Sequence, residues 1–483
     1  MNHDVNGQAP LAWGPREAPG CPAMRERRAA RGYRAMARLL LMALALTLLV
    51  GSATAGAAII DNSADPAWTG TIAGPGNTAD EARDVALAGG GVTFVTGQIA
   101  NADINLTKFV GGALIWTQVY DSPFHAQDFS YGVAVGRRGV VYTVGNSYRA
   151  SWDNSDLILI RWSAASGKVL WVRRYDGPAH EDDRGWDVGV DRRGNVTVIG
   201  VSEDATGGQD WLVRSYSPSG KIRWTKRFDG GLGAHPAGLL VAGDDSIYVA
   251  GYEQHSVPDW GVMNQSVTVR FSPSGKRLWK KTYRGPEGRG AWVYALTTRP
   301  GGGLYASGMA ATAASATDGL VVSYSAKGTR KTFVLGSAAN SQEFRDVAVT
   351  STGYVVAAGS SSANDGSDPY YVVYKSDGTV SSSGTAAGAG LDSYRAVATD
   401  GFGGFYIAGS RHLPSDDQVL TIMRRSTITN GGMFDFAWGA EYASSETRPT
   451  AIAVRDSTVT VVGLFRQNPV GPNIDQVVLT WVW

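Results

Sequence analysis

The sequence predicts an all-β protein, a β-propeller built from four-stranded blades. Short apolar runs of strand length alternate with turn residues along most of the chain, as in residues 186–228, and helical patterns are scarce beyond the N-terminus. A glycine ends the second run of each unit at intervals of 48 to 57 residues, a period typical of propeller blades. These glycines are Gly97, Gly145, Gly200, Gly251, Gly308, Gly359, Gly409 and Gly463.

Each unit divides into four expected strands, A to D. Strand A is short and rich in small residues, as at 133–135, and a tight turn such as 136–139 (GRRG) leads into an alternating strand B. Strand C begins with an aspartate six residues before an aromatic or large apolar residue in seven of eight units, and Gln265 replaces it in the fourth. This recurrence indicates a structural role, because an aspartate at a strand start can accept backbone N–H bonds. The aspartates are Asp103, Asp156, Asp210, Asp318, Asp368, Asp417 and Asp475.

Strand D carries a Trp-x-x-x-aromatic pattern in the first four units. Residues i and i+4 share one face of a strand, so we expect these side chains to pack between neighbouring blades. The turn from C to D reads Ser-Pro-Ser-Gly in the third and fourth units, which suits a type I turn. The aromatic pairs are Trp116/Tyr120, Trp171/Tyr175, Trp224/Phe228 and Trp279/Tyr283.

The two ends of the repeat predict how the ring closes. The last unit, from about Thr447, has strands A, B and C but no strand D, whereas residues 68–72 form a spare strand-D-like segment. We predict that this N-terminal strand completes the last blade and gives eight blades. Strand D is degenerate in units five to seven, so a seven-bladed ring is the alternative. No linker-like break follows residue 58, and residues 58–483 are therefore expected to form a single domain.

Residues 1–57 have the pattern of a signal peptide with a preceding basic segment. Six arginines between residues 25 and 38 precede the apolar run 39–50, and small residues with an A-x-A motif follow. The run of 12 residues is short for a membrane span, which needs roughly 20. We expect a secreted or cell-surface protein with no membrane span after cleavage; an uncleaved anchor is the alternative.

The amino-acid composition limits the classes of partner and of covalent cross-link that can be expected. The formal net charge of +1 gives no bias toward nucleic acid, and none is expected as a partner. The only cysteine is Cys21, which excludes an intramolecular disulfide. The domain is expected to be monomeric.

The repeat units resemble the bacterial SBBP-type β-propeller repeat. The resemblance rests on segments such as DDRGWDVGVDRRGNVTVIG and QDWLVRSYSPSGKIRWTKRFDGG and covers about residues 66–483. It implies a propeller fold in an exported or surface protein and carries no shared catalytic motif. A weaker resemblance to pyrroloquinoline-quinone-binding propellers rests on residues 163–171 (SAASGKVLW), but the region after the signal lacks the vicinal cysteines found in many dehydrogenases of that group.

The positions at which the units differ from one another are the candidates for binding. The D–A and B–C connections share one face, and the residue two positions before each strand A is expected at its rim. This position varies between units, as a specific asymmetric site requires, with arginines that could bind carboxylates or phosphates and aromatics that could stack on sugars. The alternative is that these side chains form an ordinary solvent-exposed rim that binds no ligand. The candidates are Arg83, Tyr131, Trp186, Tyr294, Arg345 and Arg395, with Ala237 and Pro449 in the other two units.

Three histidines are weaker candidates for a metal site. His125, His180 and His235 are expected in successive D–A connections, and residues 176–187 add carboxylates that could favour Ca²⁺ or another divalent cation. The loops that contain His125 and His180 look like copies of one another, so these histidines are explained by duplication of the repeat without a metal-binding role. Acidic residues three positions before the rim are assigned to loop structure: Asp80, Asp128, Asp183, Asp392 and Glu446.

The sequence contains no P-loop, HExxH, GxSxG or paired-cysteine motif. We therefore favour a non-catalytic binding or scaffolding module without a cofactor, with a protein, peptide or glycan as partner. The alternative is a propeller enzyme, either a lyase or hydrolase or a quinoprotein-like dehydrogenase, with its site on the D–A/B–C face. A surface protein without a small ligand is the third possibility.

Overall fold

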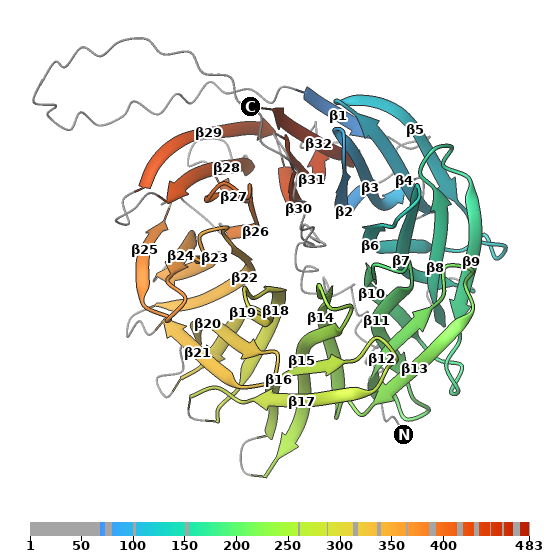
Figure 1. The fold of residues 1–483 in the computed structure, drawn as a ribbon, viewed down its shortest axis with the longest axis horizontal. Helices are drawn as coiled ribbons and strands as arrows, with labels where there is room; N and C mark the ends of the chain where they lie inside the picture. The colour runs from blue at the N-terminus through green and yellow to red at the C-terminus, as the bar shows by residue number, and fades with distance from the viewer. Residues whose placement is uncertain are drawn as a thin grey trace, which may run out of the picture.

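The strands surround a central axis, and the predicted β-propeller fold is confirmed (Figure 1). The structure is a computed structural model that describes residues 68–72, 80–99, 103–149, 154–258, 261–286, 288–312, 317–335, 340–363, 366–385, 393–412, 419–428, 434–444, 446–455, 458–466 and 474–482. Within these residues 32 strands form eight four-stranded sheets, which we number as blades 1 to 8. None of the described segments forms a helix with the length and hydropathy needed to cross a bilayer.

Blades 1 to 4 follow the chain as simple antiparallel meanders. In each, strand A is nearest the axis and strand D is outermost (Figure 1). Their strands are β2 (Glu81–Ala88), β3 (Val92–Ile99), β4 (Asp103–Val110) and β5 (Ala113–Tyr120); β6 (Asp128–Val135), β7 (Val140–Tyr148), β8 (Ser155–Ser163) and β9 (Val169–Tyr175); β10 (Asp183–Val190), β11 (Val196–Glu203), β12 (Gln209–Tyr216) and β13 (Ile222–Phe228); and β14 (Gly233–Val241), β15 (Ile247–Val257), β16 (Gly261–Phe271) and β17 (Arg277–Tyr283).

Blades 5 to 7 repeat this order, and blade 8 combines both ends of the chain. The strands are β18 (Ala291–Thr298), β19 (Gly303–Ala311), β20 (Thr317–Ser325) and β21 (Arg330–Leu335); β22 (Ser341–Val349), β23 (Val355–Ala363), β24 (Gly366–Tyr374) and β25 (Val380–Thr385); β26 (Ser393–Thr399), β27 (Gly404–His412), β28 (Val419–Ile428) and β29 (Phe434–Ser444); and β30 (Glu446–Arg455), β31 (Thr458–Arg466), β32 (Ile474–Val482) and β1 (Trp68–Ile72).

The first strand completes the last sheet. β1 pairs antiparallel with β32, with Trp68 opposite Thr480 and Ile72 opposite Gln476. The side chain of Ile72 is 4% exposed and joins the core cluster shared by blades 7, 8 and 1. Strand D of blade 8 therefore comes from the N-terminal segment, as the unequal ends of the repeat predicted.

A bulge in strand A explains the recurring glycine. In every blade the ladder between strands A and B skips one residue of strand A, for example Trp186 between Gly185 and Asp187. The carbonyl before the bulge turns toward strand B, and a Cβ on Gly200 would lie within 3.0 Å of the Arg184 oxygen, closer than real Cβ atoms approach. The same clash, with the carbonyl at the equivalent position, is found at Gly97, Gly145, Gly251, Gly308, Gly359 and Gly409. Only glycine fits beneath this bulge.

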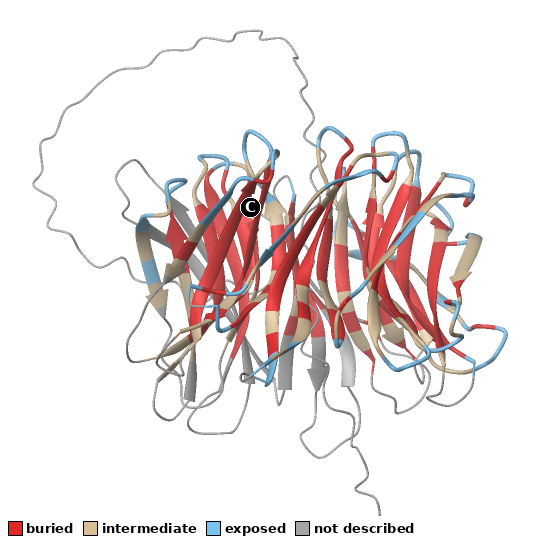
Figure 2. Ribbon diagram, turned by 90° about the horizontal axis from the view of Figure 1, so that it is seen from below, coloured by how far each residue is buried: buried red, intermediate tan, exposed pale blue. Residues whose placement is uncertain are grey.

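Apolar packing joins adjacent blades rather than the strands of one blade alone. One core cluster, for example, contains Ile199 and Trp211 of blade 3 with Val249 and Val267 of blade 4. Figure 2 shows the buried residues concentrated in the middle of the strands, with exposed residues at the turns. Side chains of alternating strand residues fill the spaces between sheets, as the period-two pattern requires.

Hydrogen bonds reinforce these contacts at two levels. Near the outer rim, tryptophans of strand D donate from Nε1 to a carbonyl in the C–D turn of the next blade: Trp171 to Pro218, Trp224 to Pro273 and Trp279 to Ala326, at 3.2, 3.2 and 3.0 Å. Near the axis, buried aspartates directly after the bulge accept from the next blade. Asp84 accepts from Val133 N, Asp187 from Leu239 N and Asp346 from Val397 N, at 2.7, 2.7 and 2.8 Å.

The antiparallel order gives the ring two different edges. The D–A and B–C connections form one, which we call the loop edge. The A–B and C–D turns form the other, the turn edge, which in the described residues consists of 89–91, 136–139, 191–195, 242–246, 299–302, 350–354 and 400–403 with 111–112, 164–168, 217–221, 272–276, 326–329 and 375–379.

Replacing a glycine beneath a bulge should destabilise the protein. For Gly200→Ala we expect the free energy of unfolding to fall by about 3 kcal/mol, because the new Cβ meets backbone that cannot move aside. Gly243→Ala is the control, since a Cβ there meets nothing within 4 Å, and it should change stability by less than about 1 kcal/mol. Chemical denaturation measures both; equal effects would contradict the bulge argument.

Removing the closing strand should also weaken the ring. Deleting residues 66–73 removes β1, its ladder with β32 and the buried Ile72 side chain. A few backbone hydrogen bonds and one buried aliphatic side chain amount to roughly 5 kcal/mol. Thermal unfolding should show a Tm lower by about 5–10 °C, and an unchanged Tm would refute closure by β1.

Candidate functional site

The six variable rim residues all lie at the bulges of the innermost strands. Each is the residue skipped by the strand A–strand B ladder. The sequence placed them just before strand A, but the strands begin earlier, so these residues lie inside them. They are Arg83 on β2, Tyr131 on β6, Trp186 on β10, Tyr294 on β18, Arg345 on β22 and Arg395 on β26.

The other two blades have small side chains at the bulge. Blade 4 has the buried Ala237, as expected. In blade 8 the expected Pro449 is paired with Gly463, and the skipped residue is Thr450. Twelve residues (451–462) separate this bulge from Gly463, whereas thirteen separate bulge and glycine in the other blades, for example 187–199 in blade 3. This difference shifts the bulge by one position. Thr450 donates from Oγ1 to the Ala82 carbonyl of blade 1 at 2.6 Å.

The bulge residues of blades 1, 2 and 3 contact one another in a row. The Arg83 guanidinium lies 5.6 Å from the centroid of the Tyr131 ring, and that ring lies 5.1 Å from Trp186. A cation over an aromatic face is attracted by the ring quadrupole. Phe129, two residues before Tyr131, stacks on it at 6.4 Å. Side chains from three different blades thus form one continuous surface.

A second row joins blades 4, 5 and 6. The Arg345 guanidinium lies 4.9 Å from the Tyr294 ring centroid, and Tyr294 meets Tyr252 edge-on at 6.3 Å. Burial raises the pKa of Tyr294, so its hydroxyl stays protonated at physiological pH. Tyr252, in the middle of strand B of blade 4, stacks on His235 at 4.4 Å. This row is therefore largely aromatic with one cation.

Carboxylates on the same strands neutralise the arginines. Glu81 lies 2.6 Å from Arg83, and Glu343 lies 2.7 Å from Arg345, each two residues before its partner. Asp182 and Arg184, at the start of blade 3, form a third such pair at 2.5 Å. The rows consequently present hydrogen-bonding groups and aromatic faces without a large net charge.

The three candidate histidines are placed in two different ways. His125 and His180 lie in the β5–β6 and β9–β10 connections, are mostly exposed, and have left-handed backbone angles (φ 50° and 58°). Their Nδ1 atoms lie 2.6 and 2.9 Å from Asp121 and Asp176 of the same loop. His235 lies inside β14, not in a connection, and burial lowers its pKa. Each of the first two histidines thus pairs with its own loop aspartate.

Two groups of three aspartates at the loop edge bring possible metal ligands within 4.8 Å of one another. They occupy equivalent places between blades 1 and 2 and between blades 2 and 3, where a strand C start meets the following D–A connection and strand A. Two strand C aspartates predicted from the repeat, Asp103 and Asp156, take part in them. The groups are Asp103, Asp121 and Asp128, and Asp156, Asp176 and Asp183.

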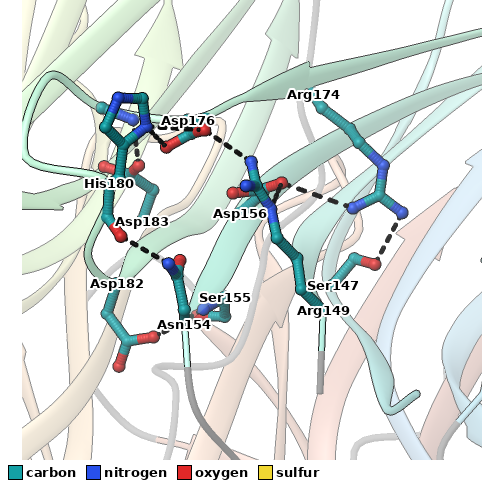
Figure 3. Close-up of polar contacts among 11 residues, drawn as sticks. Ser147, Arg149, Asn154, Ser155, Asp156, Arg174, Asp176, His180, Asp182 and Asp183 are labelled. Carbon is teal, nitrogen blue, oxygen red and sulfur yellow. Dashed lines mark hydrogen bonds and ion pairs between the residues drawn. The ribbon is translucent and has the colours of Figure 1, made fainter. Parts of the chain in front are cut away.

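Arginines already neutralise the second group. Arg149 donates to Asp156 at 3.1 Å and to Asp176 at 2.5 Å, and Arg174 lies 3.7 Å from Asp156 (Figure 3). Asp183 accepts a hydrogen bond from the Gly177 backbone, which is the loop role expected for it. Burial, with Asp156 and Asp176 nearby, raises the pKa of Asp183 to about 6. These hydrogen bonds and ion pairs fix the β9–β10 connection, and the arginines leave little negative charge to bind a metal cation.

Among the residues that the structure describes, no arginine forms an ion pair with an aspartate of the first group. Burial and the charges of Asp121 and Asp128 raise the pKa of Asp103 to about 6. Asp128 accepts from the Ser122 backbone N–H at 2.7 Å, again closing a loop. Clustered carboxylates alone do not define a metal site, and we assign no ion to this group.

A further polar cluster lies in blade 4, where the repeat has Gln265 in place of aspartate. Buried Glu253 accepts from Lys280 at 2.8 Å and from Gln265 at 3.2 Å, and Nε2 of His255 lies 2.6 Å from the Gln265 amide nitrogen. The other side of the imidazole faces Gly231, where a Cβ would approach Nδ1 to 2.8 Å. Nε2 of His255 thus lies against Gln265 and Glu253, and the side chain is 29% exposed.

Several residues of the site were not foreseen from the sequence. The carboxylates Glu81 and Glu343 and the aromatic Tyr252 contact rim residues directly. An acidic residue two positions before an arginine was a visible signal for the first two, because i and i+2 lie on one face of a strand. No local signal marks Tyr252, which comes from a different strand.

Comparison with known proteins shows the fold alone. No family model matches the chain, so the SBBP-type resemblance has no family-level match, and no curated protein matches it. The chain is similar to solved β-propeller structures at low sequence identity. The β-propeller domain of the Trilobed protease from Pyrococcus furiosus has 9% identity over 69% of this chain and 89% of that chain (TM-score 0.41). Polysaccharide lyase Uly1 has 11% identity over 86% and 91% (0.43), and the periplasmic gluconolactonase PpgL from Pseudomonas aeruginosa has 14% over 71% and 96% (0.37).

The raised pKa of Asp183 predicts a pH-dependent stability difference. The native carboxyl takes up a proton near pH 6, whereas the unfolded chain stays ionised down to about pH 4. The wild type therefore gains stability through this group as pH falls from 7 to 5, and Asp183→Asn does not. Chemical denaturation should show the free energy of unfolding of the variant, relative to that of the wild type, falling by about 1–2 kcal/mol between pH 7 and pH 5. Parallel pH profiles would contradict the assignment.

Proposed function

We propose that the chain is an exported, non-catalytic binding module that recognises a neutral carbohydrate through the bulge residues of its innermost strands. The observation that carries this proposal is the continuous row formed by Arg83, Tyr131 and Trp186, together with the carboxylate partners of the arginines. Export is inferred from the signal-like pattern of residues 1–57.

The chemistry of the two rows fits sugars better than anions. Carbohydrate hydroxyls both donate and accept hydrogen bonds, and the C–H face of a sugar ring packs on aromatic side chains. Paired groups such as Arg83 with Glu81 offer donors and acceptors side by side. A carboxylate or phosphate ligand would instead have to displace the acidic partners Glu81 and Glu343, which costs the energy of those ion pairs.

The pattern of repetition also supports binding. Backbone geometry at the bulge is the same in every blade, while the side chain there changes from arginine to aromatic to small. A ligand that spans several blades would therefore meet a different group from each. Residues that repeat, such as the tryptophans of strand D, are accounted for by contacts between blades.

A glycan array followed by isothermal titration calorimetry on the full chain tests the proposal. Trp186→Ala and Tyr131→Ala should each weaken binding of the oligosaccharide identified by about tenfold or more, in line with the loss of a stacking aromatic. Phe402→Ala, which removes an exposed aromatic at the opposite edge, should leave the affinity unchanged. Binding confined to peptides, or an equal loss in all three variants, would overturn the proposal.

A further inference from the structure

The turn edge carries exposed cations in blade after blade. Lysines at the C–D turns of five consecutive blades are exposed: Lys168, Lys221, Lys276, Lys327 and Lys375. In the part of the chain that the structure describes, the first four take part in no ion pair. The A–B turns add the exposed Arg137, Arg138 and Arg193 on the same edge.

The aspartates of the turn edge do little to offset this charge. Asp191, Asp245 and Asp400 are 8%, 6% and 3% exposed and accept backbone N–H bonds within or between the turns. Asp244 is paired with Arg270 at 2.7 Å. Exposed Asp377 is the remaining acid of the described turns. The solvent-facing charge of this edge is consequently positive.

Exposed apolar side chains lie at the same edge. They are the turn residue Phe402 (79% exposed) and residues within two positions of a C–D turn in five blades: Leu114 (56%), Leu170 (47%), Ile222 (56%), Leu278 (44%) and Val380 (47%). A single exposed aliphatic residue is unremarkable, but a set of them beside lysines on one edge marks an interaction surface.

We propose that the turn edge docks on an anionic lipid bilayer. Lysines attract acidic headgroups, and exposed aliphatic and aromatic side chains enter the boundary between headgroups and acyl chains. The short turns lie along one side of the ring in Figure 2, where successive blades can meet a flat surface together. An anionic polysaccharide would bind the lysines but would leave the apolar side chains of Ile222, Leu278 and Phe402 exposed to water. These residues therefore favour a lipid bilayer as the partner.

This docking is compatible with the proposed carbohydrate site and does not depend on it. The aspartate groups and the long connections occupy the loop edge, and the bulges lie toward that end of strand A. A ring resting on its turn edge would keep the loop edge away from the lipid. A ligand could then reach the bulge residues while the protein remains at the surface.

Sedimentation of the full chain with vesicles tests the proposal, using phosphatidylcholine alone and phosphatidylcholine with 30% phosphatidylglycerol. Lys221→Glu/Lys276→Glu reverses two charges at the turn edge, and Arg284→Glu/Arg289→Glu reverses two exposed arginines in the β17–β18 connection at the loop edge. The seven residues of β17 (Arg277–Tyr283) separate the two edges by about 23 Å, more than a Debye length at physiological salt. Since a lysine near an anionic leaflet contributes roughly a fivefold gain in affinity, the first variant should bind anionic vesicles about 25-fold more weakly, and the second like wild type.

The apolar contribution is tested separately by Phe402→Ser, which changes no charge. It should weaken binding to anionic vesicles about fivefold or more, as expected for loss of a buried aromatic side chain. All variants share residues 1–67, so differences among them report the turn edge. Equal binding to both vesicle types, equal losses in the two charge-reversal variants, or capture of an anionic polysaccharide without vesicle binding would each overturn the proposal.

Discussion

The contact between a strand B glycine and a strand A carbonyl determines how each blade is built. The strand A bulge turns the carbonyl of residues such as Arg184 onto strand B, where only a glycine such as Gly200 leaves room. The extra residue, Trp186 in this blade, stands outside the ladder pairing. Its side chain is therefore free to vary while the backbone around it is held constant.

Contacts between blades complete the frame around these bulges. An aspartate such as Asp187, directly after the bulge, ties its strand to the next blade near the axis, and a tryptophan such as Trp224 does so near the outer rim. The closing pair of β1 with β32 joins the ends of the chain in one sheet. The residues that repeat are thus used for assembly.

Much of the fold could be predicted from the sequence because the repeat records local backbone requirements. The glycine spacing, the turn residues and the unmatched last unit led to the propeller and to closure by residues 68–72. The bulge itself was not foreseen, since an unpaired residue leaves no mark on the apolar pattern. One shortened hairpin moved the eighth bulge from Pro449 to Thr450 for the same reason.

The site was harder to predict than the fold. All six candidate residues were predicted by subtraction of what repeats, and the structure adds that Arg83, Tyr131 and Trp186 contact one another, as do Tyr294 and Arg345. Pairings across different loops, such as Arg149 with Asp156 and Asp176, depend on tertiary structure and have no sequence signal. The loop histidines illustrate the same point: His235 lies in a strand because blade 4 has a shorter connection than its neighbours.

A crystal structure of Gly200→Ala would test the central claim most directly. If the glycine beneath the bulge positions the variable residue, the added methyl group will displace the Arg184 carbonyl, shift or remove the bulge of β10 and separate Trp186 from Tyr131, with the other blades unchanged. An alanine accommodated with the bulge intact and the Trp186–Tyr131 contact preserved would contradict the account.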